Sequence, residues 1–502
     1  MPLTIVDKDT ILAREVSYVL AGNIISDLAP ISVVRQMLEG DSSNVADLYY
    51  ALWSLQQGWY VLSAEGIDLD RRGTDMGRAR DPGQAASDPV TFTKTGEWID
   101  DIRLPSPQVV SATLADGTQV LYRSLQDMVL QPSGRSISGQ APATSITAGV
   151  NDRIIVNLDG DGLRTLILGT QTTGAGIAAA IQAAVLALTA NNATHQPAYT
   201  NLRCDYNVTT AGAYTLRVGT AGPTSSVVVT PSGANNGTVV LKLGLASGGT
   251  EQVGQGSLDV PVICDTIGVR GNVGAGQVNQ LVSSVPGIAS VANPLMFVNG
   301  SEPASDDAYR QDIQAWLKSL GRGNPPSVEE AVRNTKGADG QRHVQSFQVL
   351  SGASTVQVYL CDGRSLTVGC QTDTIQDVQD ELDGLGAEPG GWIACGNTAA
   401  VVSATVLPMP VSVTATIGPK DDPVQAQRTL ATTIYQTQYG WGVGESMSYK
   451  QLVEHMDAAL SQLFDAVFTQ PSQFATSPYT PFGGQIGTKI MPSTITVTIV
   501  QA

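Results

Sequence analysis

The chain has 502 residues, of which 42% are hydrophobic, 15% charged and only 5% aromatic. A chain of this length is expected to form several folding units, and its 52 glycines and 26 prolines indicate many short strands and turns. The formal net charge of −17 argues against nucleic-acid binding and against docking on anionic lipid, because both need a surface rich in lysine and arginine. No apolar stretch approaches the roughly 18 residues of a membrane span, so we expect a soluble protein.

The N-terminal segment lacks a basic start, a continuous apolar run and a small-residue cleavage site, so we expect the chain to be made in the cytoplasm. The five cysteines are odd in number and none forms a C-x-x-C pair. This spacing predicts reduced, mostly buried thiols rather than disulfides or a zinc site. The cysteines are Cys204, Cys264, Cys361, Cys370 and Cys395.

A heptad pattern marks the N-terminal region, residues 1–66, which we interpret as a helical arm. Six apolar residues recur at alternating steps of three and four, with Ser42, Ser43 and Asn44 available as helix caps. The pattern predicts a helix with a narrow apolar seam, which packs either on its own domain or on helices of other subunits. The seam residues are Val45, Leu48, Leu52, Leu55, Trp59 and Leu62.

A β-rich central domain is predicted next, in two segments that flank an insertion. Residues 67–133 and 253–300 contain short apolar runs separated by Gly, Pro and Asp-Gly turns. Residues 134–252 between them are poor in charge and rich in Ala, Gly, Thr and Val. A hairpin at 153–168, a helix over 177–188 and further strands predict an inserted, β-rich α/β module exposed on the surface.

The connector that follows, residues 301–345, is predicted to be helical. Ser305 is the expected cap of a first helix, with acidic residues in its first turn. The sequence Ser327-x-x-Glu330 matches a capping box and predicts the start of a second helix.

Residues 346–408 and 409–502 alternate strands with helices. The helix starts are predicted at Thr374, at Asp421-Asp422-Pro423 and at Ser448. Elements of this size favour two small two-layer α/β sandwiches. The predicted fold class is therefore α+β and multidomain, with an N-terminal helical arm, a β-rich central domain carrying an inserted β-rich module, and two small C-terminal α/β sandwich domains.

Two glycine-containing segments raise the question of ligand binding. Thr173-Gly174-Ala175-Gly176 follows a strand and opens a helix, as a dinucleotide-binding loop would, but no acidic strand end follows about 20 residues later, which favours a tight turn. Asp159-Gly160-Asp161-Gly162 suggests calcium, but Thr170 stands where the bidentate glutamate of an EF-hand is needed. A turn is the preferred interpretation of both.

No other pattern indicates chemistry. The histidines, His195, His343 and His455, are far apart and match no metal-binding motif, and the pairs Asp100-Asp101, Asp306-Asp307 and Asp421-Asp422 are typical of turns and caps. Active sites can be assembled from distant residues, so a missing motif lowers the enzymatic interpretation without eliminating it. We predict no catalytic, cofactor-binding or metal-binding residues and no cofactor, and we expect that the chain is not an enzyme.

An ordered set of short motifs lies in the region 271–310. It begins with Gly271-Asn272-Val273-Gly274-Ala275-Gly276 and continues with Val285-Pro286-Gly287-Ile288, Val291-Ala292-Asn293-Pro294, Gly300 and the acidic-capped helix that contains Arg310. This order resembles the central signature of the baseplate J family of contractile-tailed phages. Upstream, the segment from Asp68 to Gly73, with Gly77, Arg80, Ala85 and Val90-Thr91-Phe92, is similar to the family, as are Gly442-Val443-Gly444, Ser448 and Leu452 downstream. One departure is Pro105-Ser106-Pro107, where a Pro-x-Gly-Thr turn is usual.

The resemblance covers nearly the whole chain except about residues 134–252. It implies a structural baseplate wedge protein of the virion tail, assembled in the host cytoplasm, that links wedges into a ring around the central hub and rearranges on sheath contraction. The implied partners are a second copy of the chain, a tail protein I-like subunit, other wedge proteins including the sheath-proximal one, and the hub, without nucleic acid or membrane. N-terminal helices would join a core bundle, and C-terminal domains would link neighbouring wedges.

The main alternative is a host-surface binding or adhesion protein of the tail. It is motivated by residues 134–252, whose low charge and β-rich pattern suit an exposed binding module.

Overall fold

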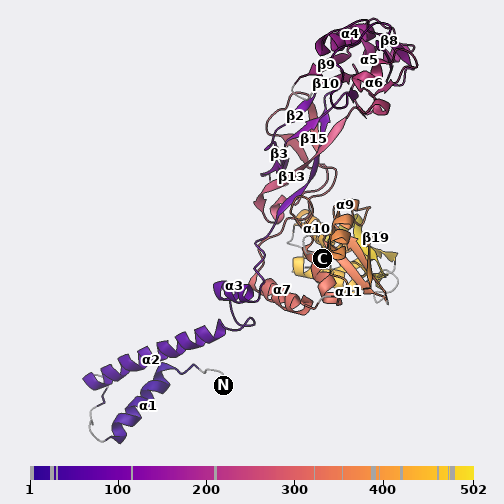
Figure 1. Cartoon of the computed structure of the whole chain (residues 1–502). Coiled ribbons are helices and arrows are strands. Elements are labelled where there is room, and N and C mark those ends of the chain that lie inside the picture. Colours follow the sequence, from indigo (N-terminus) through magenta and orange to yellow (C-terminus); the bar gives the residue numbers. More distant parts are fainter. Residues whose placement is uncertain are drawn as a thin grey trace.

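The computed structural model describes residues 5–22, 28–29, 32–114, 117–208, 212–321, 323–352, 354–385, 392–394, 396–418, 422–460, 463–472, 474 and 481–501. The molecule is elongated (Figure 1). A helical arm projects from one end, a β-rich shaft carries a module at its far tip, and α/β units lie beside the base of the shaft. The mixture of helices and sheets agrees with the predicted α+β class.

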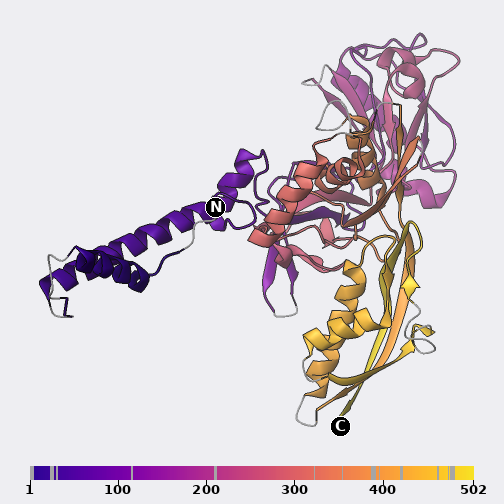
Figure 2. The same cartoon turned by 90° about the horizontal axis from the view of Figure 1, so that it is seen from below.

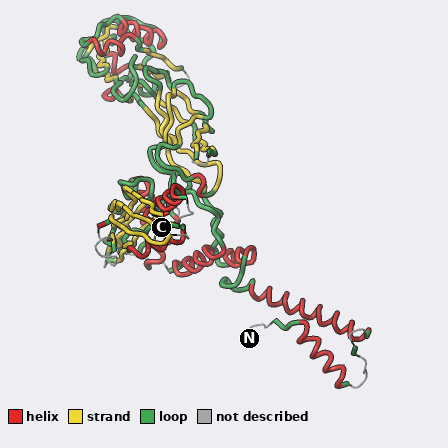
Figure 3. The backbone as a smooth tube through the Cα atoms, turned by 180° about the vertical axis from the view of Figure 1, so that it is seen from behind, coloured by secondary structure: helices red, strands yellow, loops and turns green. Residues whose placement is uncertain are grey.

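The arm is built from α1 (Lys8–Ala21) and α2 (Val33–Gln57), which pack against each other, and α3 (Gly66–Asp75) joins it to the body. The Asp7 carboxylate accepts the Thr10 amide at 2.7 Å at the start of α1, and the Ser32 hydroxyl accepts the Arg35 amide at 3.1 Å at the start of α2. Figures 2 and 3 show the two helices extending away from every other part of the chain.

The shaft is a six-stranded sheet in the order β14-β3-β4-β13-β1-β15, and all of its pairs are antiparallel. Its edge strands β14 and β15 also approach each other, so the sheet curls towards a barrel. Tyr122 and Phe297 meet edge to face in its core, with ring centroids 5.1 Å apart. The strands are β1 (Ala85–Lys94), β3 (Val109–Thr113), β4 (Gln119–Ser124), β13 (Ser257–Ile267), β14 (Val278–Leu281) and β15 (Ile288–Ala292), with β2 (Ile102–Leu104) and β5 (Met128–Leu130) forming a separate pair.

The distal module has two small sheets, ordered β12-β6-β10-β9 and β11-β7-β8, and its own buried apolar cluster. The predicted hairpin is present as β7 and β8, and the predicted helix is α4. Its elements are β6 (Arg135–Ile137), β7 (Arg153–Leu158), β8 (Arg164–Ile167), α4 (Gly174–Leu186), α5 (Gln196–Thr200), β9 (Arg203–Asn207), β10 (Ala213–Arg217), β11 (Val227–Thr230), α6 (Gly237–Leu241) and β12 (Thr250–Gln252).

The C-terminal part contains two sheets, each with helices packed on it. Sheet β16-β17-β18 goes with α8 and α9, and sheet β21-β19-β23 goes with α10 and α11. Only Ala404 separates β18 from β19, and the two sheets share a small buried cluster. The elements are α7 (Asp306–Ser319), α8 (Pro325–Asn334), β16 (Ser346–Ser351), β17 (Thr355–Cys361), α9 (Thr372–Asp383), β18 (Thr398–Ser403), β19 (Thr405–Ile417), α10 (Pro423–Gly440), β20 (Ser446–Met447), α11 (Tyr449–Ala459), β21 (Leu463–Gln470), β22 (Phe482–Gly483) and β23 (Thr488–Gln501).

Some predicted helix caps are confirmed and others are wrong. Ser305 caps α7, and Ser448 with Gln451 forms the capping box of α11. The predicted cap Ser327 lies inside α8, because Asn324 accepts the Ser327 amide at 2.8 Å and starts the helix three residues earlier. Thr374 is likewise not a cap: it lies buried inside α9, where its hydroxyl accepts a hydrogen bond from Arg364.

Candidate functional site: the helical arm and its base

The predicted seam lies only partly on a helix. Val45, Leu48, Leu52 and Leu55 belong to α2, whereas Trp59 and Leu62 follow its end at Gln57 and lie in turns. The helix also starts far earlier than predicted, because Ser32 caps it and Gly40 does not interrupt it. The expected caps at 42–44 are therefore wrong, and Ser42 is a buried helical residue whose hydroxyl donates to the Glu39 carbonyl at 3.1 Å.

The seam residues are turned towards solvent. Leu48, Leu52 and Leu55 are 58%, 44% and 57% exposed, and Trp59 and Leu62 are also exposed, while Val45 is half-buried. Ser42, the fully buried residue of α2, lies roughly 120° around the helix from Leu48 and 140° from Leu55 at 100° per residue. Packing of α1 on α2 thus leaves Leu48, Leu52 and Leu55 uncovered within the part of the chain that the structure describes.

The exposed apolar face is longer than the heptad pattern indicates. Val33 and Met37, in the first turns of α2, are 66% and 68% exposed. By helical rotation Met37 lies on the same side as Leu48 and Leu55. We call Val33, Met37, Leu48, Leu52 and Leu55 the α2 stripe. Sequence inspection missed its first two members because polar residues at 41–44 interrupt the heptad register.

At the base of the arm, residues from distant segments form a buried joint. Ala64 and Leu69 pack with Tyr309 and Ile313 of α7. The Arg310 guanidinium donates to the Val61 and Ala64 carbonyls at 3.2 and 2.8 Å, which holds the chain that enters α3. The arm is therefore firmly attached to the helical connector.

Charged groups of the family-like segments meet at this joint. Arg80 donates to Asp70 and Asp306, both at 2.6 Å, and its guanidinium stacks 4.8 Å above the Tyr309 ring. The Gly66 amide donates to Asp306 at 2.8 Å, and this bond together with Arg80 lowers the pKa of that carboxyl. A Cβ on Gly73 would lie 1.8 Å from the Tyr309 hydroxyl, so only glycine fits there.

The glycines of the central signature serve the fold of the shaft. A Cβ on Gly271 would lie 2.9 Å from the side chains of Ala86 and Cys264, and one on Gly300 would lie 2.6 Å from a backbone carbonyl. Asn272 ties these segments together, since its amide donates to the Gly300 carbonyl at 3.0 Å and its oxygen accepts the Gly300 amide at 2.8 Å. Close packing of backbone segments therefore explains why glycine occupies positions 271 and 300.

The two glycine-containing segments of the module also have structural explanations. A Cβ on Gly174 would lie 2.5 Å from the Tyr206 ring, so this glycine makes room for an aromatic side chain. The Asp161 carboxylate accepts the Asn191 and Asn192 amides at 2.7 and 2.8 Å and the Tyr199 hydroxyl at 2.9 Å. Among the described residues, no group of three His, Cys, Asp or Glu side chains could hold a metal ion.

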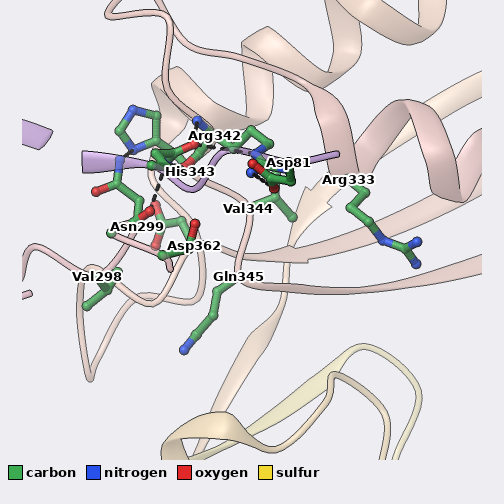
Figure 4. Close-up of a pocket in the computed structure, with 12 residues that line it drawn as sticks. Asp81, Val298, Asn299, Arg333, Arg342, His343, Val344, Gln345 and Asp362 are labelled. Carbon is green, nitrogen blue, oxygen red and sulfur yellow. Dashed lines mark hydrogen bonds and ion pairs between the residues drawn. The ribbon is translucent and has the colours of Figure 1, made fainter. Parts of the chain in front are cut away.

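A cavity of about 270 Å³ lies between the shaft and the C-terminal units (Figure 4). Its polar groups bond mainly to one another: the Gln84 amide donates to the Asn299 and Arg342 carbonyls at 2.8 Å, and Arg342 pairs with Asp81. Arg333 points away from these groups. The residues that line the cavity therefore contact one another as residues at a junction between two domains do.

The cysteines that the structure describes, Cys204, Cys264, Cys361 and Cys370, are free and buried, as predicted, and Cys395 lies outside the described residues. None of the helices in the described part of the chain has the length and apolar character needed to cross a bilayer. These features define the class of protein: an elongated, multi-unit chain with a row of exposed apolar side chains on a projecting helix.

Comparison with known proteins then gives the family. Residues 210–300 match the baseplate J-like protein barrel domain, so the chain contains a baseplate J-like barrel domain in that segment. The match supports a structural role in a baseplate. It starts within residues 134–252, which the sequence resemblance did not cover, and it includes β13, β14 and β15 of the shaft.

No curated protein matches the chain. Among solved structures, a chain of the cryo-EM structure of the anti-feeding prophage (AFP) baseplate, 6-fold symmetrised, aligns with 97% of this chain and 90% of its own length. The two chains are 11% identical and the TM-score is 0.27.

Proposed function

We propose that the chain is a structural wedge subunit of a contractile phage tail baseplate, located in the virion after assembly in the host cytoplasm. In this proposal the α2 stripe joins a bundle with a second copy and a tail protein I-like subunit. The C-terminal α/β units link neighbouring wedges into a ring around the hub, in contact with other wedge proteins, and the ring rearranges on sheath contraction.

The single observation that carries this proposal is the α2 stripe. Exposed apolar side chains on one face of a 25-residue helix leave a large apolar area in water, which burial in a helical bundle would remove. The joint around Tyr309 fixes the arm to the body, so that docking of the arm would position the whole subunit.

The test is the double substitution Leu52→Asp and Leu55→Asp. We expect it to abolish wedge assembly in reconstitution with the candidate partner proteins, because buried carboxylates are strongly unfavourable, while the body stays folded. The matched control is Tyr50→Asp with Ser54→Asp, two exposed residues of the same helix outside the stripe. Assembly of the stripe variant at the level of the control variant would contradict the proposal.

The alternative, host-surface adhesion through the distal module, is favoured by charge. Residues 134–252 contain six basic and five acidic residues, a net charge of +1, whereas the rest of the chain carries −18. Among the charges of the module, Arg135 and Arg203 pair with the shaft. A nearly neutral tip avoids the repulsion that an anionic cell envelope would exert on the acidic body.

Removal of the module separates the two functions. A Cβ on Gly254 would lie 2.2 Å from the Pro132 carbonyl, so both ends of the module lie side by side and a Gly-Gly link can join Ser133 to Gly254. Adhesion predicts tails that assemble but fail to adsorb to cells. Normal adsorption by such tails would exclude adhesion through the module.

A further inference from the structure

The junction between the shaft and the C-terminal units is held by polar contacts. Among the described residues, no buried apolar cluster contains side chains from both the six-stranded sheet and the C-terminal sheets. One backbone hydrogen bond crosses directly, from the Met296 amide to the Arg364 carbonyl at 2.9 Å. Interfaces of this polar kind permit rigid-body rotation more readily than apolar ones.

Arg364 is the centre of the junction. Its guanidinium is 4% exposed and faces Asp88 of β1 at 3.4 Å, Asp373 of α9 at 2.9 Å and Asp362 at 3.6 Å. It also donates to the Thr374 hydroxyl at 2.6 Å. Asp88 is the member of this group that comes from the shaft, and it is 3% exposed.

A second set of contacts surrounds the first. The Ser87 hydroxyl donates to Asp339 at 2.5 Å, and the same carboxylate lies 2.9 Å from the His343 ring. The other ring nitrogen of His343 lies 3.4 Å from the Asn299 amide of the shaft, and Figure 4 shows the two side chains facing each other. The Arg342 amide donates to the Gln84 side chain at 3.0 Å. The junction thus brings together the Arg364 guanidinium, the His343 ring and the carboxylates of Asp88, Asp339, Asp362 and Asp373, with the Arg342–Asp81 pair beside them.

We propose that this junction is a hinge, closed by the Asp88–Arg364 contact, about which the shaft and the C-terminal units rotate as rigid bodies, and that protonation of Asp88 favours the closed state. The hinge is a property of the isolated chain and does not depend on the assembly proposal. Each side keeps its own core when the hinge opens, because the apolar clusters end at the junction.

The environment of Asp88 gives the sign of the pH effect. Burial raises its pKa to about 7, more than Arg364 and His343 lower it, and Asp373 and Asp362 add to the rise. Opening would hydrate the carboxyl and return its pKa towards the ordinary value of 3.8. Closure is therefore strongest when Asp88 is protonated, weakens as pH rises from about 4 to about 7, and changes no further above that.

Ionisation of Asp339 has the opposite effect on closure, because it favours the closed state, but it occurs below the pH range in which Asp88 acts. Its pKa is lowered to about 2, because hydrogen bonds from His343, Ser87 and the Gln341 amide outweigh the effect of burial. The closure that it favours is complete above its ordinary pKa and is lost only as pH falls towards 2. Asp339 therefore adds no pH dependence to closure between pH 5.5 and 7.

Amide hydrogen exchange at Met296 and Arg342 tests the hinge, because both amides bond across the junction and exchange reports even rare opening. After correction for intrinsic exchange, we expect Met296 protection to fall roughly tenfold in total between pH 5.5 and 7. Val90 in the shaft and Val358 in β17, which are strand residues within each unit, should keep constant protection.

Two variants make the test specific. Asp88→Asn should abolish the pH dependence, and Arg364→Gln should lower Met296 protection at every pH without affecting Val90. The control is Asp373→Asn, which removes a 59% exposed carboxylate from the same arginine and should keep the pH dependence. Equal Met296 protection at pH 5.5 and 7, or an unchanged pH dependence in Asp88→Asn, would overturn the proposal.

Discussion

The distal module and the helical arm differ in where they place their apolar side chains. The module buries Ile154, Ile177, Tyr199 and Tyr214 completely in one cluster. In α1 and α2, by contrast, the buried apolar residues that the structure describes are Ile11 and Leu12, whereas Leu48, Leu52 and Leu55 face water. The module therefore has the core of a self-sufficient unit, whereas the arm presents an apolar helix face to water.

The largest effect on stability is expected for a substitution in the core of the module, compared in the isolated chain with a substitution in the exposed arm. Ile154→Ala should destabilise the module by about 2–5 kcal/mol, since it opens a cavity in a closed core. Leu48→Ala in the arm should change stability by no more than about 0.5 kcal/mol, because its side chain is already exposed. Amide hydrogen exchange in the module and in the arm measures the two changes in stability. If Leu48→Ala lowered stability as much as Ile154→Ala, the α2 stripe would have a packing partner within its own chain.

A smaller effect is expected at the base of the arm. Gly73→Ala places a methyl group against the Tyr309 hydroxyl, and the forced shift should cost roughly 1–3 kcal/mol. Faster amide exchange in α3 and α7, with unchanged exchange in the module, is the expected result. Unchanged exchange in α3 would mean that the joint does not hold the arm.

The smallest effect concerns how the module is attached to the shaft. Asp101 accepts Arg135 at 2.5 Å and lies 3.5 Å from Arg217, and despite partial burial these arginines lower its pKa. The stabilisation from this ion pair is fully present above the ordinary pKa of aspartate, and it is lost as pH falls through the lowered pKa of Asp101. Asp101→Asn should weaken protection of the Gln255 amide, which bonds to Gln131 beside the module, by about 1–2 kcal/mol at pH 7.

The exposed pair of Asp100 and Arg203 provides the control for Asp101. Both side chains are about half exposed, so Asp100→Asn should cost less than about 1 kcal/mol at the Gln255 amide. Equal effects of the two substitutions would mean that burial of Asp101 does not strengthen the attachment of the module.

The sequence predicts elements whose signals are local. The hairpin of β7 and β8, the cap at Ser305 and the capping box at Ser448 are present as predicted, because each depends on residues within a few positions. The start of α2 was missed, since the helix is capped at Ser32 rather than at the serines at 42–43, and Gly40 between them does not interrupt it.

Contacts between distant residues could not be predicted. Asp100 and Asp101 looked like turn residues, yet they pair with Arg203 and Arg135, far along the chain. The junction at Arg364 has no motif at all, because Asp88 lies 276 residues away. The seam itself was predicted from spacing, but its exposure became visible only once the position of α1 on α2 was known.

The most direct test of the central claim compares amide exchange over residues 33–57 in the isolated chain and in assembled tails. A helix that buries its apolar stripe in a bundle should gain strong protection on assembly, most of all around Leu48, Leu52 and Leu55. We predict fast exchange of α2 in the isolated chain and slow exchange in the tail. Equally fast exchange in both would contradict a role of the arm in the assembly.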